Sequence, residues 1–129
     1  DRGMGWFERT RTIGKKPYTL AVKVSVPDDD AVVKKAVLRA GPIVTKIEGA
    51  WAELLDAVTN ALFPAYDTRW RGDGKALSRD AFKKRLAPSE MVVDATRTTV
   101  YLRAGELFGD HGVEVRIPAK GTKREILVS

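Results

Sequence analysis

Strict alternation of apolar and polar residues between Tyr18 and Val26 predicts a β-strand with one buried face. The predicted apolar face consists of Tyr18, Leu20, Val22, Val24 and Val26. Residues 7–13 alternate less regularly, and the sequence Gly-Lys-Lys-Pro at 14–17 is typical of a turn. We therefore expect the chain to begin with a β-hairpin.

A helical pattern follows this hairpin. The acids at 28–30 predict a helix N-terminus, because aspartate caps the first turn and further acids complement the helix dipole. Apolar residues then recur every three or four positions at Val33, Val37, Ala40, Val44, Ile47, Trp51, Leu54, Leu55, Val58 and Leu62. Because an internal proline removes a helical hydrogen bond, Gly41-Pro42 predicts two helices or one sharply bent helix. Pro64 is expected to end the helical region.

The segment 66–76 contains two glycines among charged residues and is expected to be an exposed connection, although it also contains Trp70. A short helix is predicted to start at Ser78, which can cap its first turn. Leu77 and Phe82 are spaced for a hydrophobic staple across that cap. Pro88 is expected to bound this helix.

The C-terminal third alternates again, over residues 91–94, 98–104, 107–117 and 125–128, with turns between these segments. The predicted order is therefore β-β-α-α-α-β-β-β-β. Because strands and helices are segregated along the chain, we predict a single α+β domain over residues 1–129. Its sheet should be mainly antiparallel, formed by the N-terminal hairpin and the C-terminal strands, with two or three central helices packed on one face.

Three features of this pattern suggest a family: Trp70 after the central helices, the Ser78-capped helix with its inward Phe82, and the strand Leu-Phe-Gly-Asp-His-Gly-Val-Glu-Val at 107–115. Together they resemble the bacterial family of domains of unknown function numbered twenty-two sixty-two, over most of the chain. In that family a glycine directly precedes the histidine, whereas this sequence has Asp110. The resemblance implies an α+β fold and no established activity.

Composition narrows the function classes. The chain has 129 residues, 43% hydrophobic and 31% charged, as expected for one globular domain. It has no cysteine, which excludes disulfides, thiolate zinc sites and thiol nucleophiles and favours a cytoplasmic location. No apolar run is long enough to span a bilayer or to act as a signal peptide. Because the first residue is Asp1 rather than Met, we expect a fragment of a longer protein or a terminus left by cloning.

Catalytic and metal-binding interpretations are weak. His111 is the only histidine, and Asp110 beside it suggests a base with an orienting carboxylate. Adjacent strand residues point to opposite faces, however, and His111 shares the parity of Val113, so a structural histidine facing the core is the favoured interpretation. Helix capping explains the acids at 28–30 better than a cation site, and residues 72–75 lack the Ser or Thr of a phosphate-binding loop. We predict no catalytic residue, cofactor or metal.

Net charge is the strongest functional signal, at +6 with an isoelectric point near 9.7. Much of the excess lies between residues 69 and 85. The candidate partner-binding residues there are Arg69, Trp70, Arg71, Lys75, Lys83 and Lys84. A tryptophan between two arginines can stack on bases, can anchor a protein interface, or can cap the core beside solvated charges.

Three functional hypotheses follow. The leading one is a non-catalytic protein-interaction module, such as a bacterial immunity or regulatory protein, with an unidentified and plausibly acidic protein partner and no membrane attachment. The second is nucleic-acid binding through segment 69–85. The third is an enzyme centred on His111.

Overall fold

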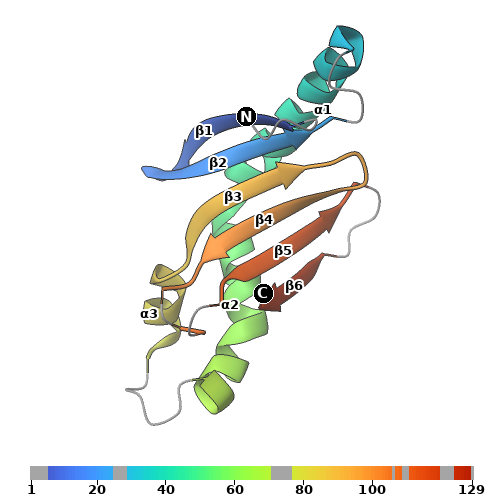
Figure 1. Ribbon diagram of the computed structural model, residues 1–129. Helices are drawn as coiled ribbons and strands as arrows, with labels where there is room; N and C mark the ends of the chain where they lie inside the picture. Colours follow the sequence, from blue (N-terminus) through green and yellow to red (C-terminus); the bar gives the residue numbers. More distant parts are fainter. Residues whose placement is uncertain are drawn as a thin grey trace.

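A mixed sheet crossed by two long helices forms the molecule (Figure 1). The computed structural model describes residues 6–24, 29–70, 77–105, 107–108, 111–119 and 124–128, with no side-chain description at 6, 7, 69 and 70. Its elements are β1 (Trp6–Ile13), β2 (Lys16–Lys23), α1 (Asp30–Gly49), α2 (Trp51–Ala65), a π-helical turn (Tyr66–Trp70), α3 (Arg79–Lys84), β3 (Ala87–Val93), β4 (Arg97–Arg103), β5 (Val113–Pro118) and β6 (Glu125–Val128).

The strand order in the described sheet is the chain order, β1-β2-β3-β4-β5-β6. Every neighbouring pair is antiparallel except β2 and β3, which are parallel. Parallel neighbours need a long crossover, and here the whole helical segment supplies it. The predicted α+β class and mainly antiparallel sheet are therefore confirmed.

The predicted N-terminal hairpin is also confirmed. β1 and β2 pair from Trp6 opposite Lys23 to Ile13 opposite Lys16, so the loop contains only two residues. Gly14 and Lys15 both have positive φ, 54° and 72°. That combination is the one that a tight hairpin turn requires, because its twist then matches the twist of the strands.

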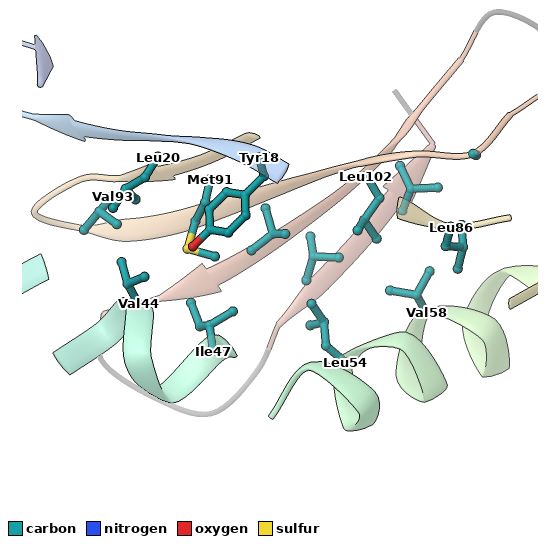
Figure 2. Close-up of a cluster of buried hydrophobic side chains, with 14 of the residues drawn as sticks. Tyr18, Leu20, Val44, Ile47, Leu54, Val58, Leu86, Met91, Val93 and Leu102 are labelled. Carbon is teal, nitrogen blue, oxygen red and sulfur yellow. The ribbon is translucent and has the colours of Figure 1, made fainter. Parts of the chain in front are cut away.

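The core lies between one face of the sheet and the helices (Figure 2). Strand side chains such as Leu20, Met91 and Leu102 point toward Val44 and Ile47 of α1 and Leu54 and Val58 of α2. The described part of the predicted β2 face is confirmed, since Tyr18, Leu20, Val22 and Val24 are all buried. Most of the predicted helical face is buried too; Val37 is an exception, at 41% exposed.

The predicted division into two helices at Gly41-Pro42 is wrong, and so is the predicted end of the helical region at Pro64. α1 continues through Pro42, and the helical segment instead divides at Ala50. Proline has no amide proton to donate to the backbone carbonyl four residues earlier in the helix. Because Pro42 is exposed, that carbonyl lies on the solvent side of the helix. Pro64 lies inside α2, and a wider π-helical turn follows it, in which the Thr68 hydroxyl donates to the Pro64 carbonyl at 2.9 Å. Tyr66 is consequently buried rather than part of an exposed connection.

The alternation at 107–117 does not form one strand. β5 begins only at Val113, and the buried neighbours Leu107 and Phe108 lie in a turn, where strand parity does not apply. Pro88 lies within β3, at a register shift between Pro88 and Glu90 opposite β4. A bulge is the position at which a strand tolerates a residue without an amide proton.

α3 begins as predicted. The Ser78 hydroxyl accepts a hydrogen bond from the Ala81 amide at 3.1 Å. Phe82 is fully buried and meets the rings of Phe63, Tyr66 and Phe108 with centroid separations of 5.3 to 6.1 Å. Among the helices described, none combines the length and apolar character needed to cross a membrane.

Candidate functional site

The predicted basic segment 69–85 is only partly described. Arg71, Lys75 and the side chains of Arg69 and Trp70 lie outside the described residues. Lys83 forms an ion pair with Asp56 of α2, and Lys84 is exposed in the last turn of α3. The structure therefore does not bring the predicted set together as one described surface.

The α3 ion pair has a structural role. Lys83 donates to the Asp56 carboxylate, and this hydrogen bond is the main reason that the pKa of Asp56 is lowered. Arg79 also reaches α2, where it donates to the side-chain carbonyl of Asn60. Two of the cations in the basic segment thus hold α3 against α2.

His111 is exposed, so the interpretation as a core-facing histidine is wrong. It precedes β5, and its backbone amide donates to the Phe108 carbonyl at 3.1 Å. Because His111 lies before the first residue of β5, the alternation of side chains between the two faces of a strand does not apply to it, and its side chain is exposed. His111 lines none of the three clefts that lie beside α1. Asp110 lies outside the described residues.

The open face of the sheet is a second candidate surface. Tyr101 lies at its centre, paired with Glu90 on β3 and Glu114 on β5. Partial burial, followed by these two carboxylates, raises the pKa of Tyr101. Arg116 pairs with Glu114 on the same strand. The charges of this face therefore compensate one another locally.

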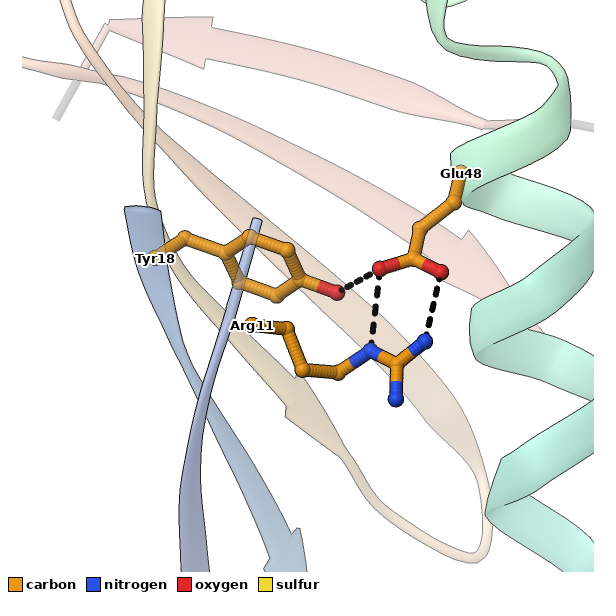
Figure 3. Close-up of polar contacts among 3 residues, drawn as sticks. All are labelled: Arg11, Tyr18 and Glu48. Atoms are coloured by element: carbon orange, nitrogen blue, oxygen red, sulfur yellow. Dashed lines mark hydrogen bonds and ion pairs between the residues drawn. The ribbon is translucent and has the colours of Figure 1, made fainter. Parts of the chain in front are cut away.

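A partly buried network joins the hairpin to α1 (Figure 3). Arg11 of β1 donates from Nε and Nη2 to the two oxygens of Glu48 at 2.9 and 2.8 Å. The Tyr18 hydroxyl of β2 donates to the same carboxylate at 2.7 Å. The bidentate hydrogen bonds from the Arg11 guanidinium lower the pKa of Glu48. Burial of Tyr18, followed by its hydrogen bond to Glu48, raises the pKa of Tyr18. This network fixes the C-terminal end of α1 against the sheet.

One side of α1 carries a row of exposed positive charges. Lys35, Arg39 and Lys46 are exposed and are separated by four and seven residues, a spacing that places them on one helix face. We call these three residues the basic flank. No ion pair or side-chain hydrogen bond joins any of them to another residue in the part of the chain that the structure describes.

Two clefts lie along the basic flank, and Arg39 lines both. The larger, which we call the α1–β5 cleft, has a volume of about 580 Å³ and lies where α1 gives way to α2. Its lining includes Ile43, Ile47, Leu54, Thr98, Ile117, Pro118, Ala119 and the charged side chains Arg39, Lys46, Glu53 and Arg124. The smaller cleft, of about 250 Å³, lies between the N-terminal half of α1 and the ends of β2 and β3. A third, of about 180 Å³, lies on the hairpin side of α1.

The acids in the two flank clefts are already paired. Glu53 accepts a hydrogen bond from Arg124 at 3.2 Å, and Asp94 lies 3.8 Å from the Lys23 ammonium. Each pair cancels one positive and one negative charge. The remaining charge in both clefts is therefore that of the basic flank, and it is positive. A surface of this kind attracts a partner that brings carboxylates.

No group of three or more acidic or histidine side chains within the described ranges is arranged to hold a metal ion. Comparisons with protein-family models, with curated proteins and with solved structures found no match for this chain. Function must therefore be argued from the geometry of the chain itself.

The basic flank was not among the residues predicted from the sequence. Its signal is present in the spacing of Lys35, Arg39 and Lys46, on a side of the helix next to its apolar face. A lysine or arginine on the polar face of a helix is ordinarily solvated, so spacing alone did not distinguish this flank from any exposed surface. The distinguishing feature is the pair of clefts beside it, which depends on tertiary packing.

Proposed function

We propose that the protein is a non-catalytic interaction module that binds an acidic protein partner through the basic flank of α1. The observation that carries the proposal is the charge distribution around the two flank clefts. Their acids are paired with Lys23 and Arg124, whereas Lys35, Arg39 and Lys46 form no ion pair among the described residues. This surface replaces the segment 69–85 as the leading interface.

Charge complementarity gives such a surface its specificity. Carboxylates of the partner facing Arg39 and Lys46 speed the diffusional encounter, and a partner with basic residues there is repelled. The clefts add concave area in which the contact excludes water. A bacterial immunity or regulatory protein works in this way, because covering the partner's surface requires complementarity rather than a reaction centre.

Affinity capture with matched charge reversals tests the proposal. The bait is the full chain, as the wild type, as Arg39→Glu/Lys46→Glu, and as Lys84→Glu/Arg85→Glu. Both double variants reverse two exposed positive charges, so they are matched in the change of net charge. Each also replaces one lysine in the last turn of a helix, Lys46 or Lys84, where a positive charge complements the helix dipole. The prey is host-cell lysate, with nuclease treatment to remove nucleic acid.

We expect an acidic protein to be recovered in stoichiometric amount by the wild type and by the α3 variant, and to be lost from the α1 variant. Quantitative mass spectrometry of the eluates measures this. Recovery of the same protein by the α1 variant would contradict the proposed surface. Absence of any stoichiometric protein, together with low-salt binding of RNA or DNA by the pure chain, would contradict protein binding altogether.

Nucleic-acid binding through segment 69–85 is the second candidate. It is favoured by the net charge of +6 and by the exposure of Lys84 in α3 and of Arg85 at the C-cap of that helix. It is weakened because Lys83 is engaged by Asp56. Phosphate contacts release counterions, so this candidate requires an affinity for RNA or DNA that falls steeply with added salt and with Lys84→Glu/Arg85→Glu.

A further inference from the structure

The α1–β5 cleft is the larger of the two clefts along the basic flank, and its floor is apolar. Ile47 and Leu54 are buried beneath it, and Ile43 and Ile117 are partly buried along its sides. A volume of about 580 Å³ falls within the range of natural ligand pockets, roughly 300–1,000 Å³. The space is therefore large enough to take a leucine or phenylalanine side chain out of water.

The rim of the same cleft is charged. Arg39 and Lys46 lie on its α1 side, and the Arg124–Glu53 pair lies on its α2 side. An apolar group that enters the cleft therefore has guanidinium and ammonium groups beside it. Carboxylates next to the apolar group would meet these cations, whereas basic neighbours would be repelled.

We infer that the α1–β5 cleft receives one apolar anchor side chain of the acidic partner, flanked in the partner's sequence by Asp or Glu residues that pair with Arg39 and Lys46. This inference rests on the proposed function and specifies the chemistry of its ligand. Anchors seated in desolvated pockets dominate the affinity of many interfaces, and surrounding charges contribute mainly to selectivity.

Other occupants fit the cleft less well. None of the described residues that line the cleft is aromatic, so they offer a nucleotide base no ring on which to stack. A second copy of this chain would bring a net charge of +6 toward the cations of the rim. An acidic protein segment with an apolar side chain satisfies both the floor and the rim.

Three fluorescein-labelled peptides serve as probes. The first has one phenylalanine in the middle of a run of glutamates, the second replaces this phenylalanine with alanine, and the third replaces the glutamates with glutamines. Fluorescence anisotropy at low ionic strength gives their affinities for the full chain. We expect the first peptide to bind at least tenfold more tightly than either of the others, a factor that corresponds to about 1.4 kcal/mol.

Amide chemical shifts locate the bound peptide. In ¹H–¹⁵N spectra, titration with the first peptide should shift the amides of Ile47, Thr98 and Ile117, which line the cleft. The variant Ile43→Gln makes one wall polar and should abolish the preference for phenylalanine over alanine. Its control is Leu38→Gln, which changes an apolar residue that is 67% exposed on α1 and does not line the cleft.

The outcomes separate the inference from the proposed function. Equal binding of the phenylalanine and alanine peptides, with both lost in Arg39→Glu/Lys46→Glu, would overturn the anchor and leave the acidic partner in place. Failure of both acidic peptides to bind even at low salt would contradict the inference and the proposed function together. Loss of the phenylalanine preference in Leu38→Gln as well as in Ile43→Gln would place the anchor outside the cleft and overturn the inference. Thermal melting of each variant separates these results from unfolding.

Discussion

At the scale of residues, Glu48 connects the fold to the proposed surface. Its carboxylate accepts hydrogen bonds from Arg11 of β1 and Tyr18 of β2, and it lies on α1 only two residues after Lys46. The network therefore fixes the helix end that carries part of the basic flank. Arg11 is partly open to water, so solvent weakens its ion pair with Glu48. The hydrogen bond from the buried Tyr18 to Glu48 is better shielded and retains more of its strength.

Replacing Glu48 with Gln should destabilise the protein by about 1–2 kcal/mol near neutral pH, because the hydrogen bonds lose their charged acceptor. Folding lowers the pKa of Glu48, so the unfolded chain is protonated at higher pH than the folded chain. The stabilisation is therefore complete above the unfolded pKa and disappears as the pH falls through the lower, folded value. Urea unfolding of wild type and variant, from about pH 7 to about pH 3, measures the difference.

The control is Glu53→Gln, which removes a carboxylate from an exposed ion pair. Exposed pairs contribute little, so this variant should stay within about 1 kcal/mol of the wild type. A Glu48→Gln deficit that is the same at acidic and neutral pH would contradict the assigned role of the carboxylate.

Residue-level features differ in how far the sequence could predict them. The burial of Tyr18 followed from alternation, and a helix start at the acids of 28–30 followed from their place before the helical pattern, although only the structure shows that Asp29 is the cap. The bond from Tyr18 to Glu48 did not, because it joins residues thirty positions apart on different elements. The exposure of His111 was missed because the start of β5 is set by the preceding turn rather than by the alternation of side chains.

At the scale of elements, α1 is the main structural support of the proposed interface. Its apolar residues Ala36, Ala40, Val44 and Ile47 are buried, and its basic flank lies on another side of the same helix. The sequence predicted the buried face, but it also predicted that Gly41-Pro42 would divide the helix or bend it sharply, and the division does not occur. The helix continues there because exposed backbone can leave a carbonyl to water, a compensation that local sequence rules do not include.

The N-terminus of α1 gives a prediction at this scale. The Asp29 carboxylate accepts hydrogen bonds from the amides of Ala31 and Val32, at 2.9 and 3.3 Å. Asp29→Ala should therefore reduce the free energy of unfolding by about 1 kcal/mol. Asp30→Ala, which removes a neighbouring acid that acts only through the helix dipole, should cost about 0.5 kcal/mol or less. Chemical denaturation compares them, and equal losses would contradict the assignment of Asp29 as the cap.

At the scale of the whole molecule, the order of elements and the α+β class could be predicted because periodicity separates strands from helices along the chain. The parallel pairing of β2 with β3 and the clefts beside α1 could not, since they depend on how distant segments pack. The predicted basic segment also offers less free charge than its sequence indicates, because Lys83 forms an ion pair with Asp56. Local charge density in a sequence does not show which charges the fold leaves unpaired.

The central claim is that Arg39 and Lys46, rather than the cations of α3, meet an acidic partner. The most direct measurement is the affinity of the phenylalanine-containing acidic peptide across a range of ionic strengths, for the wild type, Arg39→Glu/Lys46→Glu and Lys84→Glu/Arg85→Glu. We predict that added salt weakens wild-type binding, that the α1 variant binds at least about tenfold more weakly, and that the α3 variant stays within about twofold of the wild type. Unchanged affinity in the α1 variant, or an equal loss in the α3 variant, would contradict the account.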